Sequence, residues 1–590
     1  MFRSLANIFS LNRLKLPAQN KLPFLLGLLC LSSLYLWSYL ASHYRPAVSI
    51  TPTSSLEGAL LAADFAEREN DLPAMIIYYQ RAHKIQPDNT DIISRLMDSY
   101  LELGEMAKAH RHAQDLMVAY PHDEIVQTLL AVQALRQNDW QNAVGHAQML
   151  TSKNAAGILG LIIQLWAYDA LDDTPAVEAV IEKLKQQKHY ADIGLRNLAL
   201  FYAHKASVEE AEALYRQIGR QYGFPNIDHA LDYVFFLHQH DFPQMRDEFF
   251  TAIGGQNPHH AVYRHVKPVL QVVPNGSERM TPQKAVAQAM AAISALGVSD
   301  NEIQAMKYAR FAHWLMPDER RVMMALAEAL ADNEAYDEAI ALYETMLQEP
   351  NQAPYYKDLI LASIALLHEA KEETQRAVFL LETAKLENQN FFLVKVLADM
   401  LRRQEAYEQA ELNYNWLIEQ LETVKPTDWE LFYGRGIVHE QLGHWPAAER
   451  DLLKALELSD NRPYVLNYLG YSWIDNGENI NQGLAMVEKA VQAEPNNGYF
   501  IDSLGWAFYR LGEFDKAVRL LEHAVMILPD EAEIMDHLGD ALWQAGREYE
   551  ARYHWQRTLT LDISDATREK ILKKIDVGVY EEFSGEKPAL

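Results

Sequence analysis

The sequence predicts an all-α solenoid of stacked helix pairs, preceded by one membrane-spanning helix near the N-terminus. Two observations predict this class. Landmark residues recur every 34 positions in two separate regions, and a long uncharged apolar run lies near the N-terminus. A third observation concerns function: no motif typical of an active site interrupts the pattern. We therefore expect a binding protein and not an enzyme.

Composition narrows the classes of partner. The 590 residues carry a formal net charge of -28, from 53 Lys and Arg against 81 Asp and Glu. So acidic a surface repels phosphate backbones, which makes nucleic acid an unexpected partner. Hydrophobic residues make up 49% of the chain, enough for an extended core. Cys30 is the single cysteine, so neither an intramolecular disulfide nor a cysteine zinc site can form.

The repeat is clearest toward the C-terminus. Gly505 recurs as Gly539 and Ala517 as Ala551, each 34 residues on. The N-terminal columns with the same period are Tyr79, Ala113 and Ala147; Ala82, Leu116 and Leu150; and Pro87 and Pro121. A 34-residue period with Leu-Gly, aromatic, Ala and Pro landmarks is the signature of the tetratricopeptide repeat, a pair of antiparallel helices.

The residue types have physical reasons. Small residues such as Gly505 and Ala517 belong where two helices cross closely, and proline ends the second helix. No single pair can bury its apolar face, so neighbouring pairs must stack. Weaker second helices are predicted at Ala211, Tyr215 and Ile218; at Ala339, Tyr343 and Met346; at Ala377, Leu381 and Ala384; and at Ala410, Tyr414 and Leu417.

Breaks in the register suggest the organisation of the chain. Residues 254–280 are rich in Gly, Pro and His and read as an irregular connection, and the step around Pro426 is lengthened. The predicted segments are 1–21, a basic cytoplasmic N-terminus; 22–41, a transmembrane anchor or uncleaved signal; 42–55, a linker; 56–253, an N-terminal repeat array; 254–280, the connection; 281–422, a middle array; 423–562, a C-terminal array; and 563–590, a capping helix and tail.

The apolar run from Leu22 to Ala41 has 20 residues, which as a helix span about 30 Å, one hydrocarbon core. Nothing comparable recurs along the chain. The basic residues that precede the run, with no acidic residue among them, are Arg3, Arg13, Lys15 and Lys21. The positive-inside rule keeps that end in the cytoplasm, so the solenoid is expected in the periplasm of a Gram-negative cell, anchored in the inner membrane.

Two alternatives remain for this segment. Cleavage near Ala41 would release the protein into the periplasm, although the apolar core is long for a signal peptide. Acylation of Cys30 would make an outer-membrane lipoprotein, but Leu29 stands where a small residue is required. An uncleaved anchor is the favoured interpretation.

Binding is expected on a protein-binding groove, because the first helix of each pair lines the concave side of such solenoids. The candidate groove residues of the last three full repeats are Asn467, Tyr471, Asp502, Trp506, Tyr509, Arg510, Asp536, Asp540 and Trp543. The aromatic members are the preferred candidates, since rigid rings give contact area at low entropic cost. Arg510 either receives a peptide carboxylate or pairs with a neighbouring acid.

No catalytic residue, metal site or cofactor is predicted. His259 and His260 stand in a loop without nearby carboxylates, and no acid pair stands out among the solvated helix faces. A transferase fused to the repeats would need a separate catalytic domain, and residues 254–280 are too few to form one.

The blocks LNYLGY, DSLGWAFYRLG and DHLGDALWQAGR, which lie between Leu466 and Leu559, resemble the C-terminal repeats of a proteobacterial family of exported tetratricopeptide proteins. LNYLGYSW and the ending ARYHWQR are similar to its alphaproteobacterial branch. That family includes a lipoprotein adaptor that brings peptidoglycan-hydrolase substrates to a carboxyl-terminal processing protease. The resemblance implies an envelope adaptor for proteolysis or cell-wall turnover. Leu29 departs from the adaptor's lipidation pattern and favours the inner membrane.

The function expected from these observations is a non-catalytic scaffold that binds other proteins or peptides in the cell envelope. The alternative is a scaffold for polysaccharide export or outer-membrane assembly. The two differ in what a deletion strain accumulates or lacks: hydrolases in the first case, polymer or porins in the second. A cytosolic co-chaperone would require the opposite membrane orientation.

Overall fold

The computed structural model describes residues 55–69, 71–151, 153–222, 227–256, 280–297, 302–348, 354–387 and 390–579. All regular structure within these ranges is helical. The predicted anchor, residues 22–41, lies outside them, as does most of the predicted connection. Among the described helices, none combines the length and the apolar character needed to cross a bilayer.

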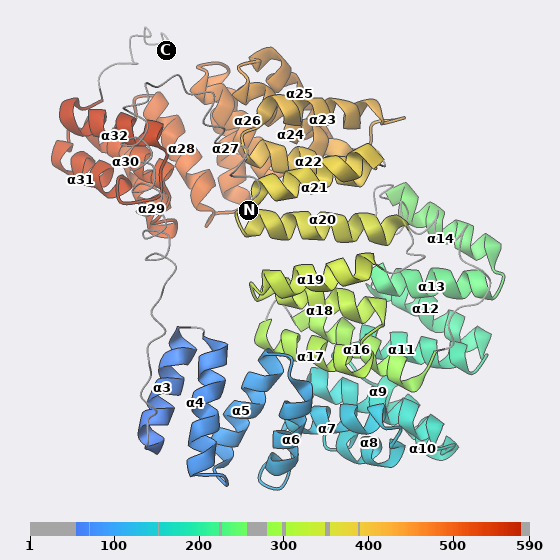
Figure 1. The fold of residues 1–590 in the computed structure, drawn as a ribbon. Helices are drawn as coiled ribbons and strands as arrows, with labels where there is room; N and C mark the ends of the chain where they lie inside the picture. The colour runs from blue at the N-terminus through green and yellow to red at the C-terminus, as the bar shows by residue number, and fades with distance from the viewer. Residues whose placement is uncertain are drawn as a thin grey trace, which may run out of the picture. The chain divides into compact units, whose positions relative to one another are not determined.

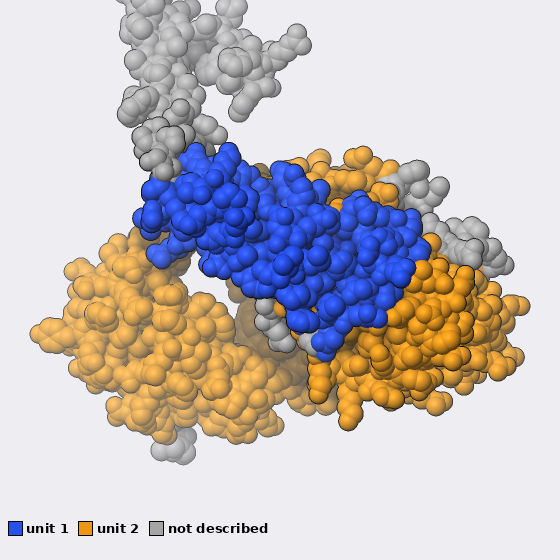
Figure 2. Space-filling view, turned by 90° about the horizontal axis from the view of Figure 1, so that it is seen from below, with its two compact units in different colours: residues 1–152 blue, residues 153–590 orange. Residues whose placement is uncertain are grey.

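The chain divides into two compact units, residues 1–152 and 153–590 (Figure 2). The described helices of the first unit form three pairs. They are α3 (Leu56–Arg68) with α4 (Leu72–Ile85), α5 (Thr90–Glu102) with α6 (Met106–Leu116), and α7 (Glu124–Arg136) with α8 (Trp140–Ala147).

The second unit begins with α9 (Ala155–Ala170), α10 (Thr174–Lys185), α11 (Ala191–His204), α12 (Val208–Tyr222), α13 (Ile227–Gln239) and α14 (Pro243–Gln256). Its middle holds α16 (Pro282–Gly297), α17 (Glu302–Leu315), α18 (Arg320–Asp332), α19 (Tyr336–Leu347), α20 (Pro354–Ala370), α21 (Thr374–Glu387), α22 (Phe391–Arg403) and α23 (Tyr407–Glu419). Its last part holds the short 3-10 helix η4 (Pro426–Asp428), then α24 (Trp429–Gln441), α25 (Trp445–Leu458), α26 (Pro463–Asp475), α27 (Ile480–Ala493), α28 (Gly498–Arg510), α29 (Phe514–Ile527), α30 (Ala532–Gln544), α31 (Glu548–Thr558) and α32 (Asp565–Val577).

The two helices of each pair cross where the sequence places its small residues. Ala517 and Ala551 are fully buried, and a Cβ added to Gly505 would lie 2.7 Å from Leu521 Cγ. The landmark columns therefore mark close helix crossings, as predicted. The weaker second-helix triplets of α12, α19, α21 and α23 are also buried, which confirms the helix pairs of the middle region.

The turn inside each pair needs one residue in the left-handed region. In the C-terminal repeats glycine supplies it, as at Gly512 (φ 76°) and Gly546 (φ 80°). In the middle repeats glutamate takes the same place at Glu334, Glu372 and Glu405, with φ between 58° and 60°. A non-glycine residue adopts this conformation at a cost of about 1 kcal/mol. The helix pairs of the middle repeats therefore form without a turn glycine.

Successive pairs stack through two kinds of contact. The second helix of one pair packs on the first helix of the next, as α29 does on α30, and first helices also contact one another, as in α26–α28–α30 (Figure 1). First helices of neighbouring repeats therefore form a continuous surface.

At α9 the surface formed by the first helices is covered by another helix. α9 is apolar on all sides and almost entirely buried, because α16 packs against α9 and α11. The expectation that no second all-round apolar run occurs is therefore wrong. At 16 residues, however, α9 is a core helix and shorter than a membrane span. The apolar faces of the first helices α9 and α11 are therefore covered by α16, another helix of the same unit.

A buried ionic group holds this arrangement together. Asp232 of α13 accepts hydrogen bonds from Arg196 Nε of α11 at 2.6 Å and from Arg321 Nη1 of α18 at 2.5 Å. Burial alone would raise the pKa of Asp232, but the two guanidinium charges outweigh it and hold that pKa below its usual value. Gln288 of α16 accepts from Arg196 Nη2 at 3.5 Å and donates to Glu319 at 2.9 Å. Helices on both sides of residues 257–279 thus share one polar cluster.

The tightest helix crossing gives a first prediction. A Cβ on Gly470 of α26 would lie 2.7 Å from the carbonyl oxygen of Gly483 in α27, a backbone atom that cannot move alone. We expect Gly470→Ala to lower the free energy of unfolding by about 1–3 kcal/mol, as overpacking does. Gly145 of α8 has no atom within 4 Å of its Cβ position, so Gly145→Ala should stabilise by about 0.5–1 kcal/mol. Urea unfolding followed by circular dichroism compares the two; equal effects would contradict the close crossing.

The ionic cluster gives a second prediction. Asp232→Asn removes the buried carboxylate that Arg196 and Arg321 share, and because Arg196 is fully buried the change should cost about 3–5 kcal/mol in unfolding free energy. Glu178→Gln, on the exposed face of α10, is the matched control and should change stability by less than about 0.5 kcal/mol. The same urea titration at pH 7 measures both. An Asp232→Asn protein as stable as the control would show that the cluster does not hold these helices.

Candidate functional site

The nine predicted groove residues all lie on first helices. Asn467 and Tyr471 belong to α26, while α28 and α30 carry the others. Local sequence sets these helices: Asn497 caps α28 by accepting hydrogen bonds from the next turn, and Pro463 begins α26. Contacts of α28 with both α26 and α30 bring the three sets of side chains together.

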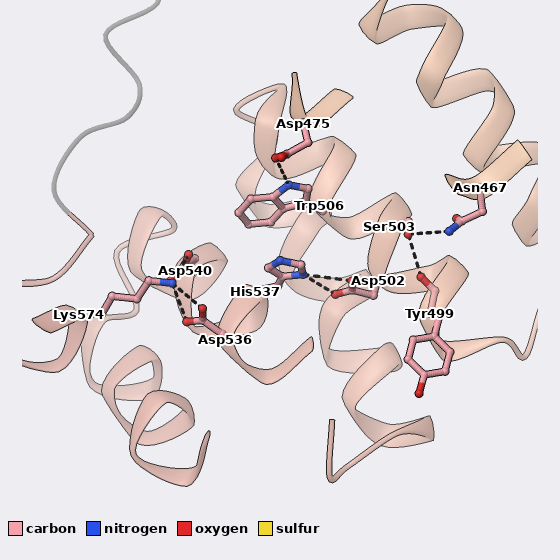
Figure 3. Close-up of polar contacts among 10 residues, drawn as sticks. All are labelled: Asn467, Asp475, Tyr499, Asp502, Ser503, Trp506, Asp536, His537, Asp540 and Lys574. Atoms are coloured by element: carbon pink, nitrogen blue, oxygen red, sulfur yellow. Dashed lines mark hydrogen bonds and ion pairs between the residues drawn. The ribbon is translucent and has the colours of Figure 1, made fainter. Parts of the chain in front are cut away.

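Trp506 lies at the centre of the group. Its ring stacks on Tyr509, with centroids 4.5 Å apart, and on His537 of the next first helix, at 4.2 Å. Its Nε1 donates to Asp475 Oδ1 at 3.3 Å (Figure 3). Trp506 is therefore held in one orientation while its indole remains partly exposed. Such a rigid, half-exposed aromatic is the type of side chain that anchors protein interfaces.

Arg510 has an acidic neighbour in the structure. Arg510 Nη1 lies 2.8 Å from Asp475 Oδ1, and both side chains keep solvent contact, with 29% and 50% of their surface exposed. An exposed pair of this kind contributes about 0–1 kcal/mol. Arg510 thus pairs with an acid of the preceding repeat, and its role toward a peptide carboxylate stays a prediction.

Asp502 and His537 form a buried pair. His537 Nδ1 lies 3.0 Å from Asp502 Oδ1, and both residues are more than nine-tenths buried (Figure 3). Burial alone would lower the pKa of His537. The charge of Asp502 and the hydrogen bond to it, reinforced by Glu533 and Asp536, outweigh burial and raise that pKa to about 9. At neutral pH the pair is an imidazolium and a carboxylate, which link α28 to α30.

Acidic groups surround Tyr471. Burial is the main cause that raises the pKa of its hydroxyl, and four carboxylates add to it. These carboxylates come from four successive first helices: Glu440, Asp475, Asp502 and Glu533. The phenol therefore stays neutral at any physiological pH, in a strongly negative surrounding. Glu533 is exposed, and Glu440 is half-buried where it accepts from Tyr468 at 2.5 Å.

Asn467 makes the link between α26 and α28. Its Nδ2 donates to Ser503 Oγ at 3.0 Å, and Ser503 Oγ in turn donates to the carbonyl of Tyr499 at 3.0 Å (Figure 3). The amide oxygen of Asn467 is buried without a hydrogen bond. The side chain of Asn467 is therefore partly engaged in contacts within the fold.

The last repeat is occupied by the chain itself. Lys574 of α32 lies 2.7 Å from Asp536 Oδ1 and 2.8 Å from Asp540 Oδ2 (Figure 3). Asp540 also accepts from Trp555 Nε1 at 3.2 Å. Burial and the charge of Asp536 raise the pKa of Asp540 to about 6, against the effect of the ammonium group. A carboxylate pair predicted to meet a partner thus holds an ammonium of the same chain.

Trp543 is likewise covered. Gly578, at the end of α32, packs so closely on its ring that a Cβ there would collide with it. Arg552 lies over the same ring, 4.8 Å from the centroid, and its Nε donates to the carbonyl of Ile575 at 3.1 Å. Trp543 therefore packs beneath α32, which begins after its N-cap residue Ser564.

The nine candidates thus separate by burial. The buried candidates are Asp502, Tyr509, Asp536 and Asp540, and the partly exposed ones are Asn467, Tyr471, Trp506, Arg510 and Trp543.

Three acidic residues of this surface were not predicted from the sequence: Asp475, Glu440 and Glu533. A usable signal existed: the linked residues Asp475 and Arg510, like Asp502 and His537, are 35 positions apart, about one repeat. We call Glu440, Tyr471, Asp475, Trp506, Arg510 and Glu533 the first-helix face.

This face has the chemistry of a binding surface. It offers a neutral phenol, a fixed indole and several carboxylates, and it lacks a paired nucleophile and base. Within the described ranges, no group of three or more His, Cys, Asp or Glu side chains is arranged to hold a metal ion.

Comparisons with known proteins agree with the repeat. A family model described as tetratricopeptide repeat matches residues 303–354 and 503–566. A TPR repeat-containing protein of Pseudomonas aeruginosa is 30% identical over 115 residues, 20% of this chain and 19% of its own length. The interferon-induced protein with tetratricopeptide repeats 2 of Cricetulus griseus is 31% identical over 117 residues, 19% of this chain and 25% of its own length. The chain thus spans about a fifth to a quarter of these relatives.

Among solved structures, the APC/C hetero-tetramer Cut9-Hcn1 covers 88% of this chain and 96% of its own, at 14% identity and a TM-score of 0.37. A MamA structure covers 31% of this chain and 96% of its own, at 21% identity and a TM-score of 0.24. The described part of the chain is thus all-helical, and its residues 303–354 and 503–566 match the tetratricopeptide repeat, a fold that typically serves as a scaffold for protein interactions.

The Asp502–His537 pair gives a third prediction. The folded-state pKa of His537, about 9, lies above the value of about 6.5 in an unfolded chain. Its stabilising contribution is therefore complete below pH 6.5 and is lost as the pH rises through 9. We expect the unfolding free energy of the C-terminal repeats to fall by about 2–3 kcal/mol across that window.

Asp502→Asn is the control for this prediction, because it removes the charge and the hydrogen bond that chiefly raise the pKa of His537 against burial. Urea titrations from pH 6.5 to 9.5, followed by Trp fluorescence, should show a slope for the native protein and almost none for the variant. Parallel profiles would contradict the pair.

Proposed function

We propose that this protein is an envelope scaffold that binds a cationic segment of another protein on the first-helix face. The observation that carries the proposal is the group of partly exposed Tyr471 and Trp506 set among carboxylates of four successive repeats. The aromatic rings supply contact area, and the carboxylates give the surface a negative charge that favours a cationic partner.

Charge complementarity selects the partner's chemistry. The basic groups at this surface are already engaged: Arg510 lies on Asp475, and the His537 imidazolium lies on Asp502. Glu533 and part of Asp475 remain open to solvent. A segment bearing Lys or Arg would gain ion pairs there and pack against the exposed part of Trp506, whereas an acidic segment would be repelled.

The location is part of the same proposal. The run from Leu22 to Ala41 would anchor the chain in the inner membrane, with the basic N-terminus in the cytoplasm and the solenoid in the periplasm. The resemblance of residues 466–559 to exported repeat proteins supports this placement. It also suggests the finer role, in which the scaffold presents substrates to a periplasmic processing protease.

The fourth prediction tests the binding surface. The full chain, solubilised from membranes, should retain a defined set of envelope proteins, including a processing protease if the finer role holds. Tyr471→Ala combined with Trp506→Ala should reduce retention about tenfold or more, since the two rings are anchors. Glu533→Gln, an exposed and isosteric change, should weaken retention less and reduce its dependence on salt.

Matched controls lie elsewhere on the same repeats. Tyr549 and Tyr553 of α31 are 91% and 60% exposed, and their replacement by alanine should leave retention unchanged. Glu488→Gln on α27 is the control for Glu533→Gln. Loss of retention in the α31 variant, or full retention in the Tyr471 and Trp506 variant, would place the partner away from the first-helix face.

A further inference from the structure

We propose that α32 is a tethered, displaceable occupant of the last repeat, and that the Asp536–Asp540 pair beneath it is a cation subsite for a Lys-bearing segment of the partner. This inference rests on the proposed function, because it extends the first-helix face by one repeat. Its central observation is a cation already seated in the site: the Lys574 ammonium, within 2.8 Å of both carboxylates.

The site is built to hold that cation. Asp536 and Asp540 stand one helical turn apart on α30, so both carboxylates reach the same ammonium. Trp555 Nε1 fixes Asp540 by a hydrogen bond, and Trp543 forms an adjoining aromatic surface. Carboxylates and aromatic rings are the groups that recognise alkylammonium ions.

The occupant is weakly attached compared with the helices it covers. Of α32, only Ile571 and Lys574 are buried, whereas α30 buries nine residues. Leu572 and Val577 are 52% and 41% exposed. Docking of α32 therefore depends on the buried Ile571 and Lys574 and on a few peripheral contacts. These contacts are the partly buried Ile575 and Val579, the hydrogen bonds from Arg552 to the Ile575 carbonyl and from Arg568 to the Leu559 carbonyl, and the contact of Gly578 with Trp543. An ammonium from another segment can replace Lys574 without leaving the two buried carboxylates uncompensated.

The subsite also continues the open surface. Asp536 and Glu533 belong to the same turn of α30, and both act on His537, which stacks on Trp506. A cationic segment that crosses Tyr471 and Trp506 in the direction of the C-terminus reaches Asp536 next. Binding along the whole path then requires that α32 move away, so the partner and α32 compete.

Hydrogen exchange of the full chain, with and without a lysine-rich peptide, tests the competition. We expect amides of residues 565–577 to exchange faster when the peptide binds, while those of α29 do not change. A peptide of glutamate with the same length should have no effect. Binding that quenches Trp506 fluorescence but leaves α32 exchange unchanged would overturn the displacement and leave the proposed function standing.

Two variants make the test independent of one substitution. Lys574→Met frees the carboxylate pair, and Ile571→Ala weakens the docking of α32 without touching that pair. Each should raise the affinity for the lysine-rich peptide about tenfold, because the bound conformation no longer competes with α32. Lys570→Met, an exposed lysine of the same helix, should have no effect.

Unchanged affinity in both Lys574→Met and Ile571→Ala would show that α32 is a permanent cap. Failure of the lysine-rich peptide to bind any of these proteins would refute the cation subsite. Retention of envelope proteins that depends on Trp506 would still support the scaffold in that case, so the two proposals fail separately.

Discussion

The close crossing of two helices at small residues is the constraint on which the rest of the structure depends. At Gly470 and Gly483 the backbones approach so closely that a single methyl group would collide with a carbonyl oxygen. A single pair of such closely packed helices has apolar side chains on both of its outer faces. The pair cannot bury these side chains by itself. Stacking follows, and stacking aligns the first helices. Residues about 35 positions apart, such as Asp502 and His537, then meet across neighbouring repeats.

The same constraint explains how the chain treats the surfaces that stacking leaves open. The apolar first helices α9 and α11 are covered by α16 from the same unit. At the C-terminal end α32 lies on α30 and α31, with Lys574 placed between two carboxylates. Between these covered regions, the first-helix face keeps aromatic and acidic groups in contact with solvent. The part of the first-helix surface that stays open to solvent, and so to a partner, is therefore its polar part.

Sequence reasoning predicted the features that depend on local spacing. The 34-residue columns identified buried residues such as Ala517 and Tyr79, and they placed the nine groove candidates on first helices. It could not predict which candidates are engaged within the chain, because Lys574 and Asp536 meet only after three helices have packed. Asp232 gave no signal in the sequence. Its partner Arg196 lies 36 positions away, and its partner Arg321 lies 89 positions away, a separation that does not fit the repeat period.

Site-specific photocrosslinking in intact cells tests the central claim most directly. A photoreactive residue at position 471, on the first-helix face, is compared with one at position 553, on the exposed side of α31. The scaffold account predicts adducts at position 471 whose crosslinked peptides carry Lys or Arg, and no matching adducts at position 553. Adducts confined to position 553, or acidic peptides at position 471, would contradict it.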